Sequence, residues 1–350
     1  MILGEGLNPR PFIRRLKSSM EPIIPLDTQQ ILAIAQFRED IQEGKYSFSE
    51  NPCLCGGRND QIVGLRDRYG LQVKTVLCQS CGLLRTDPSF DEESMFRFYD
   101  QYYRRIYTKD GDVPSTLFST QLAHGGKIVR FLENRGIAPA GRVLEVGCGA
   151  GGILAAFRDS GAQVAGCDLG KPFLEYGRER GLSLEYGGVE TLSHHGPAAM
   201  VILAHVLEHF RYPVEELKKI RRLLSDEGSI YLEVPGLFWI EESYNKDFGK
   251  YLQNAHVYHY CLESLDYVLS LAGFSRVWGD ERIVAVYRKA ATPIHYPSHL
   301  PEKSLNYLRK MERLRLARGF ASMARSKIIG LGNSLLKRAV SRISATFFLR

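Results

Sequence analysis

The chain has 350 residues, 44% of them hydrophobic, and a formal net charge of +7. A chain of this length usually forms more than one domain, and this apolar content is enough for a sizeable core. The sequence contains no run of eighteen apolar residues, and its N-terminus lacks the apolar segment of a secretory signal. We therefore expect a cytoplasmic protein rather than a membrane-spanning or exported one.

The positive charge is concentrated near the C-terminus. Residues 301–350 hold twelve Lys or Arg and two Glu, a net charge of +10, so the other 300 residues carry a net charge of −3. A nearly neutral body argues against a protein that binds nucleic acid along its whole surface.

The first 45 residues contain one predicted element. Residues 1–30 are proline-rich, and we interpret them as a loose lead-in. Residues 28–43 have the spacing of a short amphipathic helix. The apolar side predicted for this helix carries Ile31, Ile34, Ala35 and Phe37.

Two close cysteine pairs follow in residues 46–88. They are Cys53-x-Cys55 and Cys78-x-x-Cys81, each followed by glycine, and alternating apolar residues predict a strand between them. Four thiolates on two turns suit a tetrahedral zinc ion, which in such a closed site is structural. Seven cysteines without a secretory context also favour thiols or metal ligands over disulfides. We predict a zinc ribbon; four unrelated thiols are the alternative, because the first pair is one residue shorter than usual.

Two helices are predicted in residues 89–136. The first begins after a start signal at Asp87-Pro88-Ser89, and the second, over residues 117–135, is closed by Gly136. The aromatic side of the first helix should pack on the next domain, with one or two side chains lining an acceptor pocket as the alternative. That side carries Tyr99, Tyr102, Tyr103 and Tyr107.

Residues 142–157, RVLEVGCGAGGILAAF, predict a buried strand, a glycine turn and the start of a helix. Glycines let the backbone approach a ligand, and the helix start offers free N–H groups. The run Gly147-x-Gly149-x-x-Gly152 fits a dinucleotide fingerprint. However, the carboxylate of Glu145 would repel a pyrophosphate, whereas it suits a ligand that carries an ammonium and a sulfonium group.

Strands and helices alternate from there to residue 290. This alternation predicts a parallel sheet with helices on both faces, and the last two strands are so close that they must pair antiparallel. The predicted strands are 142–146, 162–167, 182–186, 200–204, 229–234, 275–279 and 282–288. The predicted helices are 152–159, 172–180, 214–224 and 262–272.

Two polar positions follow the second and third strands. Asp168 ends the second strand, where a carboxylate accepts both ribose hydroxyls of a bound nucleoside, although a turn or helix-capping aspartate would look the same. Val189 and Glu190 follow the third strand, at the expected edge of the adenine, with an exposed loop as the alternative.

The run Glu145-x-Gly147-x-Gly149-x-Gly151 resembles the first motif of class I methyltransferases that use S-adenosylmethionine (SAM), and Leu203 to Phe210, LAHVLEHF, resembles the motif after their fourth strand. Together with the cysteine pairs, residues 50–290 resemble bacterial sugar C- and O-methyltransferases that carry an N-terminal zinc-binding domain, found in antibiotic and surface-polysaccharide pathways. Those C-methyltransferases have a further large C-terminal domain, for which this chain has too few residues. The resemblance implies a doubly wound, Rossmann-like α/β fold, and it implies a cofactor site at Glu145, Gly147, Cys148, Gly149, Gly151, Asp168, Leu169, Val189, Glu190, Ala204 and His205.

Histidines supply the candidates for a base. On a helix, His205, Glu208 and His209 would share one face, and related O-methyltransferases bind a divalent ion with an acidic triplet at this spacing; we treat a metal here as the minor alternative. The 25-residue stretch 236–260 is long for a connection and rich in aromatic residues that suit sugar rings. Its His256 is the preferred base, with His209 and Tyr258 as further catalytic candidates and a packing role as the alternative.

The tail shows leucines at near-helical spacing between basic residues. This pattern predicts a basic amphipathic helix that lies on an anionic membrane face or docks on a partner, with a solvated or dimer-packing helix as the alternative. We therefore divide the chain into five segments. They are the lead-in with its short helix (1–45), the zinc ribbon (46–88), a helical linker (89–136), the SAM-binding domain (137–290) and the basic tail (291–350).

The sequence as a whole predicts SAM-dependent methyl transfer to a small molecule, most specifically a sugar, sugar nucleotide or glycan in bacterial polysaccharide or secondary-metabolite biosynthesis. SAM and a structural zinc ion are the expected cofactors, and no nucleic-acid partner is expected. The alternatives are an NAD-dependent sugar oxidoreductase and a zinc-ribbon adaptor that binds nucleic acid through its basic tail.

Overall fold

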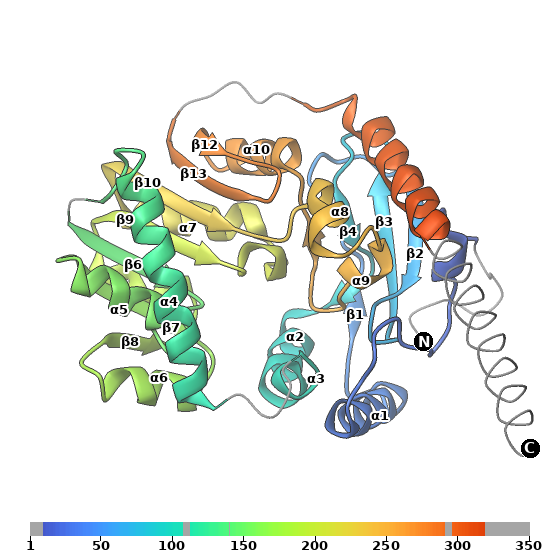
Figure 1. Cartoon of the computed structure of the whole chain (residues 1–350), viewed down its shortest axis with the longest axis horizontal. Coiled ribbons are helices and arrows are strands. Elements are labelled where there is room, and N and C mark those ends of the chain that lie inside the picture. The colour runs from blue at the N-terminus through green and yellow to red at the C-terminus, as the bar shows by residue number, and fades with distance from the viewer. Residues whose placement is uncertain (1–9, 108–112, 140, 291–295, 319–350) are drawn as a thin grey trace, which may run out of the picture.

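The computed structural model of the chain describes residues 10–107, 113–139, 141–290 and 296–318. Figure 1 shows two parts side by side: a large sheet wrapped by helices, and a smaller sheet flanked by helix α1 (Thr28–Gln42) and by the helix 300–318. Helices α2 (Glu92–Phe98) and α3 (Arg104–Tyr107) lie between the two parts, at the lower edge of the view.

The large sheet has seven strands in the order β12-β13-β10-β9-β6-β7-β8. All of its pairs are parallel except those of β13, which lies antiparallel between β10 and β12. This mixed, mostly parallel sheet confirms the predicted Rossmann-like α/β fold with a terminal antiparallel hairpin. Its strands are β6 (Arg142–Val146), β7 (Gln163–Asp168), β8 (Ser183–Tyr186), β9 (Ala198–Ala204), β10 (Leu224–Glu233), β12 (Phe274–Gly279) and β13 (Val284–Lys289).

Helices cover both faces of this sheet because its strands are apolar on both sides. One buried cluster joins the sheet to α4, α5 and α6, and another joins it to α7 and α10. These helices are α4 (Pro114–Glu133), α5 (Gly152–Asp159), α6 (Lys171–Arg178), α7 (Pro213–Leu223) and α10 (Leu262–Leu271). The prediction placed the fifth strand at residue 229; instead β10 begins directly after α7 and contains a register shift between Leu224 and Ser229.

The smaller sheet contains a strand that the sequence pattern did not predict. Its order is β11-β4-β3-β2, and all of its pairs are antiparallel. β2 (Asp60–Arg66), β3 (Gln72–Cys78) and β4 (Leu84–Thr86) come from the cysteine-bearing segment. β11 (Tyr258–His259), however, comes from the long connection after β10, so the two parts share one sheet.

The N-terminal segment packs more closely than predicted. Ile13, directly before the 3-10 turn η1 (Arg14–Leu16), and Leu16, its last residue, are buried in the core, so this stretch is not a loose lead-in. Helix α1 begins with a capping box at Asp27, as its polar start favours. Its buried side was only partly predicted. Ala33, Ile34 and Phe37 are buried, whereas Ile31 and Ala35 are exposed.

The tyrosine-rich helix begins later than predicted. Ser89–Phe90 forms the short strand β5, which pairs with β1 (Phe48–Ser49), and the helix cap is Asp91, whose carboxylate accepts from the Ser94 N–H at 2.8 Å. After α2 the backbone widens into a π-helical turn, η2 (Tyr99–Tyr103), before α3. Such turns insert one residue per turn and frequently occur at functional sites.

Within the basic tail the structure describes residues 296–318, of which 300–318 form a helix. Its apolar residues Leu300, Leu308 and Met311 are buried against η1, β2 and the connection after β10. The apolar side of this part therefore packs on the protein itself, which the sequence pattern did not predict. That connection also contains η5 (Leu237–Trp239), α8 (Ile240–Ser243) and α9 (Phe248–Tyr251). The rest of the predicted tail helix, 319–350, lies outside the described residues. No helix within the described ranges is long and apolar enough to cross a membrane.

Candidate active site

The glycine turn lies at the centre of the large sheet. The order of the strands reverses between β6 and β9, and open α/β sheets bind ligands at the carboxyl ends of such neighbouring strands. Gly147, Gly149 and Gly151 all have positive φ angles, between +55° and +79°, which favour glycine. A Cβ on Gly147 would lie 2.5 Å from Val206, so the turn packs directly against the segment that follows β9.

Glu145 lies beneath the glycine turn and is 1% exposed. Its Oε2 is buried and has no hydrogen-bond partner among the described residues. Burial, reinforced by the nearby Asp168 carboxylate, raises the pKa of Glu145 well above its usual range. A buried oxygen without a partner is costly, so this carboxyl group is suited to a further polar contact.

Asp168 connects the glycine turn to the next strand. Its carboxylate accepts from the Gly149 N–H at 2.8 Å and from the Gly170 N–H at 2.7 Å. A carboxylate has about four acceptor positions, so two remain for ribose hydroxyls. Leu169, beside it, is 42% exposed and offers an apolar surface at the same sheet edge.

The other predicted cofactor residues take different positions. Cys148 is fully buried, and its N–H donates to the Cys167 carbonyl at 3.0 Å, so its side chain packs below the turn. Val189 is also buried in the core. Glu190 folds back onto the Gly188 N–H at 3.3 Å in the loop after β8. The side chains of these residues therefore do not meet at the turn.

Helix α4 covers the glycine turn through a residue that the sequence analysis missed. Gln121 accepts from the N–H groups of Ala150 and Gly152 at 3.2 and 3.4 Å, and it donates to the Cys148 carbonyl at 3.0 Å. One amide side chain thus satisfies three backbone groups of the turn. No local motif marks this residue, because its partners lie in a segment almost thirty residues further along the chain.

The segment after β9 is a tight turn and not an α-helix. His205 has φ +58°, and residues Leu207–His209 form the 3-10 turn η4. The expected three side chains nevertheless meet. The buried Oε1 of Glu208 lies 3.7 Å from Nδ1 of His205 and 3.8 Å from Nε2 of His209. His205, after Ala204 at the strand end, is mostly exposed, whereas Glu208 is 2% exposed.

The long connection after β10 brings its histidine to this turn. The Val257 N–H donates to the Glu208 carbonyl at 2.8 Å, and Nδ1 of His209 lies 3.0 Å from the Ala255 carbonyl. These contacts place the rings of His209 and His256 edge to face, with 4.9 Å between their centroids. Burial lowers the pKa of His209, and it lowers that of His256 well below the usual range, so both rings stay neutral.

Tyr258 does not join this cluster. Its hydroxyl donates to the Asn51 amide oxygen at 3.1 Å, in the cysteine-bearing part, and its side chain is 1% exposed. In β11 successive side chains point to opposite faces, so Tyr258 points away from His259, whose ring centroid lies 5.7 Å from that of His256. We assign Tyr258 to packing.

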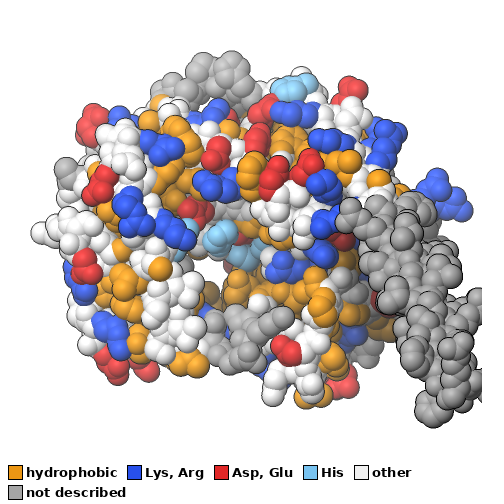
Figure 2. Space-filling view, in the orientation of Figure 1, with side chains coloured by type: hydrophobic (Ala, Val, Ile, Leu, Met, Phe, Trp, Pro, Cys, Tyr) orange, Lys and Arg blue, Asp and Glu red, His pale blue; other side chains and the backbone are white. Residues whose placement is uncertain are grey.

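Tyrosines of the π-helical turn face the histidines. The rings of Tyr99 and Tyr103 lie 5.8 and 6.0 Å from His209, and they stack on each other at 4.6 Å. Burial raises the pKa of Tyr103, and the negative charges of Glu208 and Asp168 raise it further. Figure 2 shows histidine side chains on the wall of a hollow between the two parts of the molecule.

A second polar group at the same sheet edge was also missed. Nε2 of His124, on α4, lies 2.6 Å from Oε2 of Glu233 at the end of β10, and the Tyr231 hydroxyl donates to the other oxygen. Burial alone would raise the pKa of Glu233, but its hydrogen bonds with His124 and Tyr231 outweigh burial and lower it. The acid and its histidine lie far apart in the sequence, so no spacing signals the pair.

The four paired cysteines form one cluster in the smaller part. Neighbouring sulfur atoms are 3.5 Å apart in Cys53–Cys81 and Cys53–Cys55, and 3.6 Å apart in Cys55–Cys78. A zinc ion with bonds of about 2.3 Å holds tetrahedral sulfurs roughly 3.8 Å apart, so the donor set and its spacing fit zinc.

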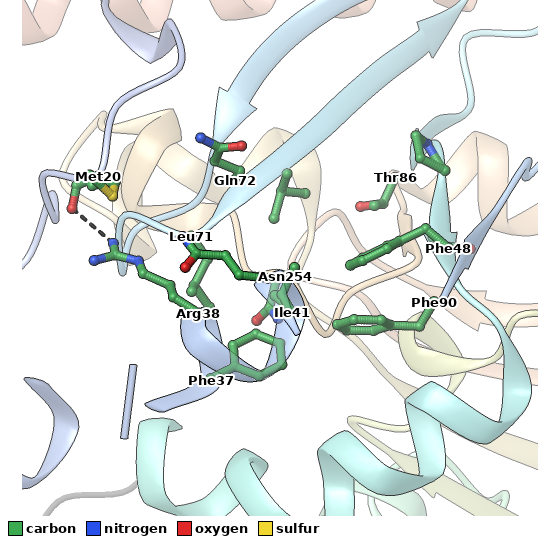
Figure 3. A pocket seen from close by; sticks show the side chains of 14 residues that line it. Met20, Phe37, Arg38, Ile41, Phe48, Leu71, Gln72, Thr86, Phe90 and Asn254 are labelled. Carbon is green, nitrogen blue, oxygen red and sulfur yellow. Dashed lines mark hydrogen bonds between the residues drawn. The ribbon is translucent and has the colours of Figure 1, made fainter. Parts of the chain in front are cut away.

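A separate cavity of about 400 Å³ lies between α1 and β3. Figure 3 shows Phe37, Phe48 and Phe90 on its wall and Arg38 at one end, where the guanidinium donates to the Met20 carbonyl at 3.0 Å. Asn254, which also lines the cavity, accepts a hydrogen bond from the Tyr107 hydroxyl. The sequence analysis did not find this cavity, because its wall is assembled from distant segments.

A family model matches most of the segment that forms the large sheet. The family model described as a methyltransferase domain matches residues 117–277, a range that contains the glycine turn, Asp168 and the Glu208 turn. The chain carries a class I, SAM-dependent methyltransferase domain. The overlap with the dinucleotide fingerprint therefore does not indicate an oxidoreductase.

The methyltransferase domain has relatives of two kinds. The chain is 34% identical to a ubiquinone biosynthesis O-methyltransferase of Idiomarina loihiensis over 29% of this chain and 45% of the relative. It is 25% identical to the C-methyltransferase NovU of Streptomyces niveus over 70% of this chain and 56% of the relative. The chain thus spans about half the length of these curated relatives.

Solved methyltransferase structures also match. The CcbJ methyltransferase of Streptomyces caelestis is 17% identical, with a TM-score of 0.40 over 56% of this chain and 96% of the other. The magnesium protoporphyrin IX methyltransferase of Synechocystis is 18% identical, with a TM-score of 0.39 over 56% of this chain and 97% of the other.

Proposed function

We propose that this protein transfers the methyl group of SAM to a small-molecule acceptor of the sugar class, a sugar, sugar nucleotide or glycan. The observation that carries the proposal is the cluster of Glu208, His209 and His256 facing Tyr99 and Tyr103, next to the glycine turn. Aromatic faces suit the apolar C–H faces of sugar rings, and the histidines supply neutral nitrogens.

The residues around the glycine turn fit the cofactor. We assign the methionine part of SAM to the turn at Gly147–Gly151, and we assign its ribose to Asp168. The unpartnered Oε2 of Glu145 below the turn and the free acceptor positions of Asp168 support this fit. SAM, when bound, supplies an electrophilic methyl group, so the chain has mainly to align the acceptor and remove its proton.

We assign removal of this proton to the histidine cluster. Nδ1–H of His209 donates to the Ala255 carbonyl, so the lone pair of Nε2 is available on the side of Glu208. His256 is held neutral beside it, which keeps a second lone pair available. Either nitrogen takes a proton from a hydroxyl group or from a carbon next to a carbonyl. Both O- and C-methyltransferases occur among the relatives.

We further infer a structural zinc ion at Cys53, Cys55, Cys78 and Cys81. The ion would hold the turns on either side of β2 and β3, and so would support the sheet that β11 joins. Peripheral membrane contact through the basic tail remains a prediction for residues beyond 318, because the apolar side of helix 300–318 is already covered.

The test combines binding and turnover. The purified chain is titrated calorimetrically with S-adenosylhomocysteine (SAH) and, in parallel, with NAD, and labelled SAM is then offered with a panel of nucleotide sugars and catechol-type phenols. We expect SAH binding, methyl transfer to a sugar, and at least a hundredfold loss of turnover with unchanged SAH affinity in His209→Ala. Binding of NAD alone, or transfer to the phenols only, would contradict the proposal.

A further inference from the structure

Three side chains of the candidate site have the donor set of a metal centre. One oxygen of Glu208 and one ring nitrogen each of His209 and His256 lie within 4.8 Å of one another. Two histidines and one carboxylate are the ligands of many zinc and iron sites. Metal–ligand bonds of about 2.1 Å hold such ligand atoms roughly 3.4 Å apart. Side-chain rotations that move these atoms by about 1 Å would therefore bring all three within bonding distance of one ion.

The hydrogen bonds around the cluster leave its donor atoms unused. Oε2 of Glu208 is buried and has no hydrogen-bond partner among the described residues, and the side chain is 2% exposed. His209 uses Nδ1 on the Ala255 carbonyl, which directs the lone pair of Nε2 toward Glu208. Metal-binding histidines typically donate their other ring N–H to a carbonyl in this way, because the contact fixes the ring.

Another group of similar composition lacks these features. Glu185, His194 and His195 also approach within 4.8 Å, but their side chains are 36%, 63% and 19% exposed. None of their side-chain atoms is buried without a partner. Exposed groups of this kind are common in proteins without a bound metal. The Glu185, His194 and His195 group therefore serves as the control in the metal-binding test.

We propose that Glu208, His209 and His256 bind a divalent transition-metal ion of the zinc type. The proposal rests on the proposed methyl transfer and refines how the acceptor loses its proton. A water on the ion has its pKa lowered to about 7 and is available as hydroxide. That hydroxide takes the proton of the acceptor hydroxyl and becomes water. The resulting alkoxide then attacks the methyl carbon, and the electron pair of the broken C–S bond stays on sulfur, which leaves as SAH.

The test is a titration of the full chain with Co²⁺, because the visible absorption spectrum of bound Co²⁺ depends on which atoms are its ligands. Thiolate-to-cobalt charge-transfer bands report the cysteine cluster, whereas ligand-field bands without a thiolate band report nitrogen and oxygen ligands. We expect a nitrogen–oxygen site that takes up one Co²⁺ per chain in the wild-type protein. Glu208→Gln and His256→Ala should lose this equivalent and keep the thiolate bands. His195→Ala, the matched control, should keep both signals.

Calorimetric SAH binding by each variant shows that the methyltransferase domain is folded. A wild-type chain without the nitrogen–oxygen signal, or loss of that signal in His195→Ala but not in Glu208→Gln, would overturn the metal site. Methyl transfer to sugars without bound metal would leave the proposed function intact while rejecting the metal. Conversely, a metal-loaded chain that binds no SAH would reject the methyl transfer and, with it, the hydroxide step.

Discussion

The carbonyl oxygen of Glu208 accepts a hydrogen bond from the backbone N–H of Val257 at 2.8 Å. This bond joins the turn after β9 to the connection after β10, and β11 then continues that connection into the sheet of the cysteine-bearing part. Because this bond is made by the backbone, it persists when the rings of His209 and His256 are replaced, whereas the contact of the His209 ring with the Ala255 carbonyl is lost. Substitutions of these two rings should therefore remove chemistry without separating the segments.

Replacing Asp168 with alanine should weaken SAH binding by about 10- to 100-fold, because hydrogen bonds to a charged group contribute about 1.5–3 kcal/mol each. The variant also frees the N–H groups of Gly149 and Gly170, which the carboxylate now holds. Isothermal titration calorimetry measures the change. Asp159→Ala, at the exposed end of α5, is the control and should bind as the wild type does. Equal affinities in all three proteins would show that Asp168 does not hold the ribose.

Two neighbouring glycines of α4 should respond oppositely to alanine. A Cβ on Gly125 would lie 2.8 Å from Cα of Ile153, so Gly125→Ala should lower the free energy of unfolding by about 1–3 kcal/mol through overpacking. A Cβ on Gly126 meets its nearest atom at 3.6 Å, so Gly126→Ala should raise that free energy by about 0.5–1 kcal/mol. Urea denaturation of both variants checks the pair; destabilisation by both substitutions would mean that α4 does not approach α5 this closely.

Arg85 should be one of the most sensitive positions of the smaller sheet. Its guanidinium donates to both carboxylate oxygens of Asp60, at 2.9 and 2.7 Å, and to the Asn51 carbonyl at 2.7 Å, while the side chain is 2% exposed. Arg85→Met should lower the free energy of unfolding by about 3–5 kcal/mol, because it leaves a partly buried carboxylate unpaired. Arg158→Met, the control, breaks the exposed pair with Asp159 and should change the free energy of unfolding by less than about 1 kcal/mol. Similar losses in both variants would contradict this assignment.

Asp67 should make stability depend on pH. Burial raises the pKa of this carboxyl group to about 7, although the N–H groups of Tyr69, Leu71 and Asn254 donate to it and oppose the shift. Between about pH 4 and pH 7 the folded chain therefore holds a proton that the unfolded chain has lost. The contribution of Asp67 to stability falls by up to about 1.4 kcal/mol per pH unit over this window and is constant above it.

The variant Asp67→Asn isolates this contribution, because its side chain stays neutral. It should be less stable than the wild type at pH 5, and the gap should narrow as the pH rises to 7. Chemical denaturation at pH 5, 6, 7 and 8 follows the gap. A gap that widens with pH would mean that the folded state favours the Asp67 carboxylate.

Local patterns predicted the large sheet well and the contacts between distant segments poorly. Helix α5 has the predicted bounds, because Gly151 and the apolar run that follows define it locally. The burial of Ile34 followed from its spacing, but the exposure of Ile31 did not, since both are apolar and only the neighbouring layer distinguishes them. Likewise, nothing in the sequence near Tyr258 shows that this residue lies in a strand paired with β4.

The candidate site was predicted in part for the same reason. His209 was predicted from the motif after the fourth strand, and His256 was predicted from the aromatic-rich connection. The structure brings these two residues together. Gln121 and the His124–Glu233 pair were missed, because each depends on α4 lying over the sheet edge. Residues that act across elements leave no periodic signal in either element.

The helix 300–318 bears on how the protein is made. Leu300, Leu308 and Met311 share one buried cluster with Ile13 and Leu16, so this core includes residues from both the first and the last described segments. During translation, the residues that bury η1 are synthesised only after the whole methyltransferase domain. The cysteine-bearing part therefore keeps an exposed apolar face until the residues around 311 have left the ribosome. A nascent chain halted before these residues would expose that face to chaperones.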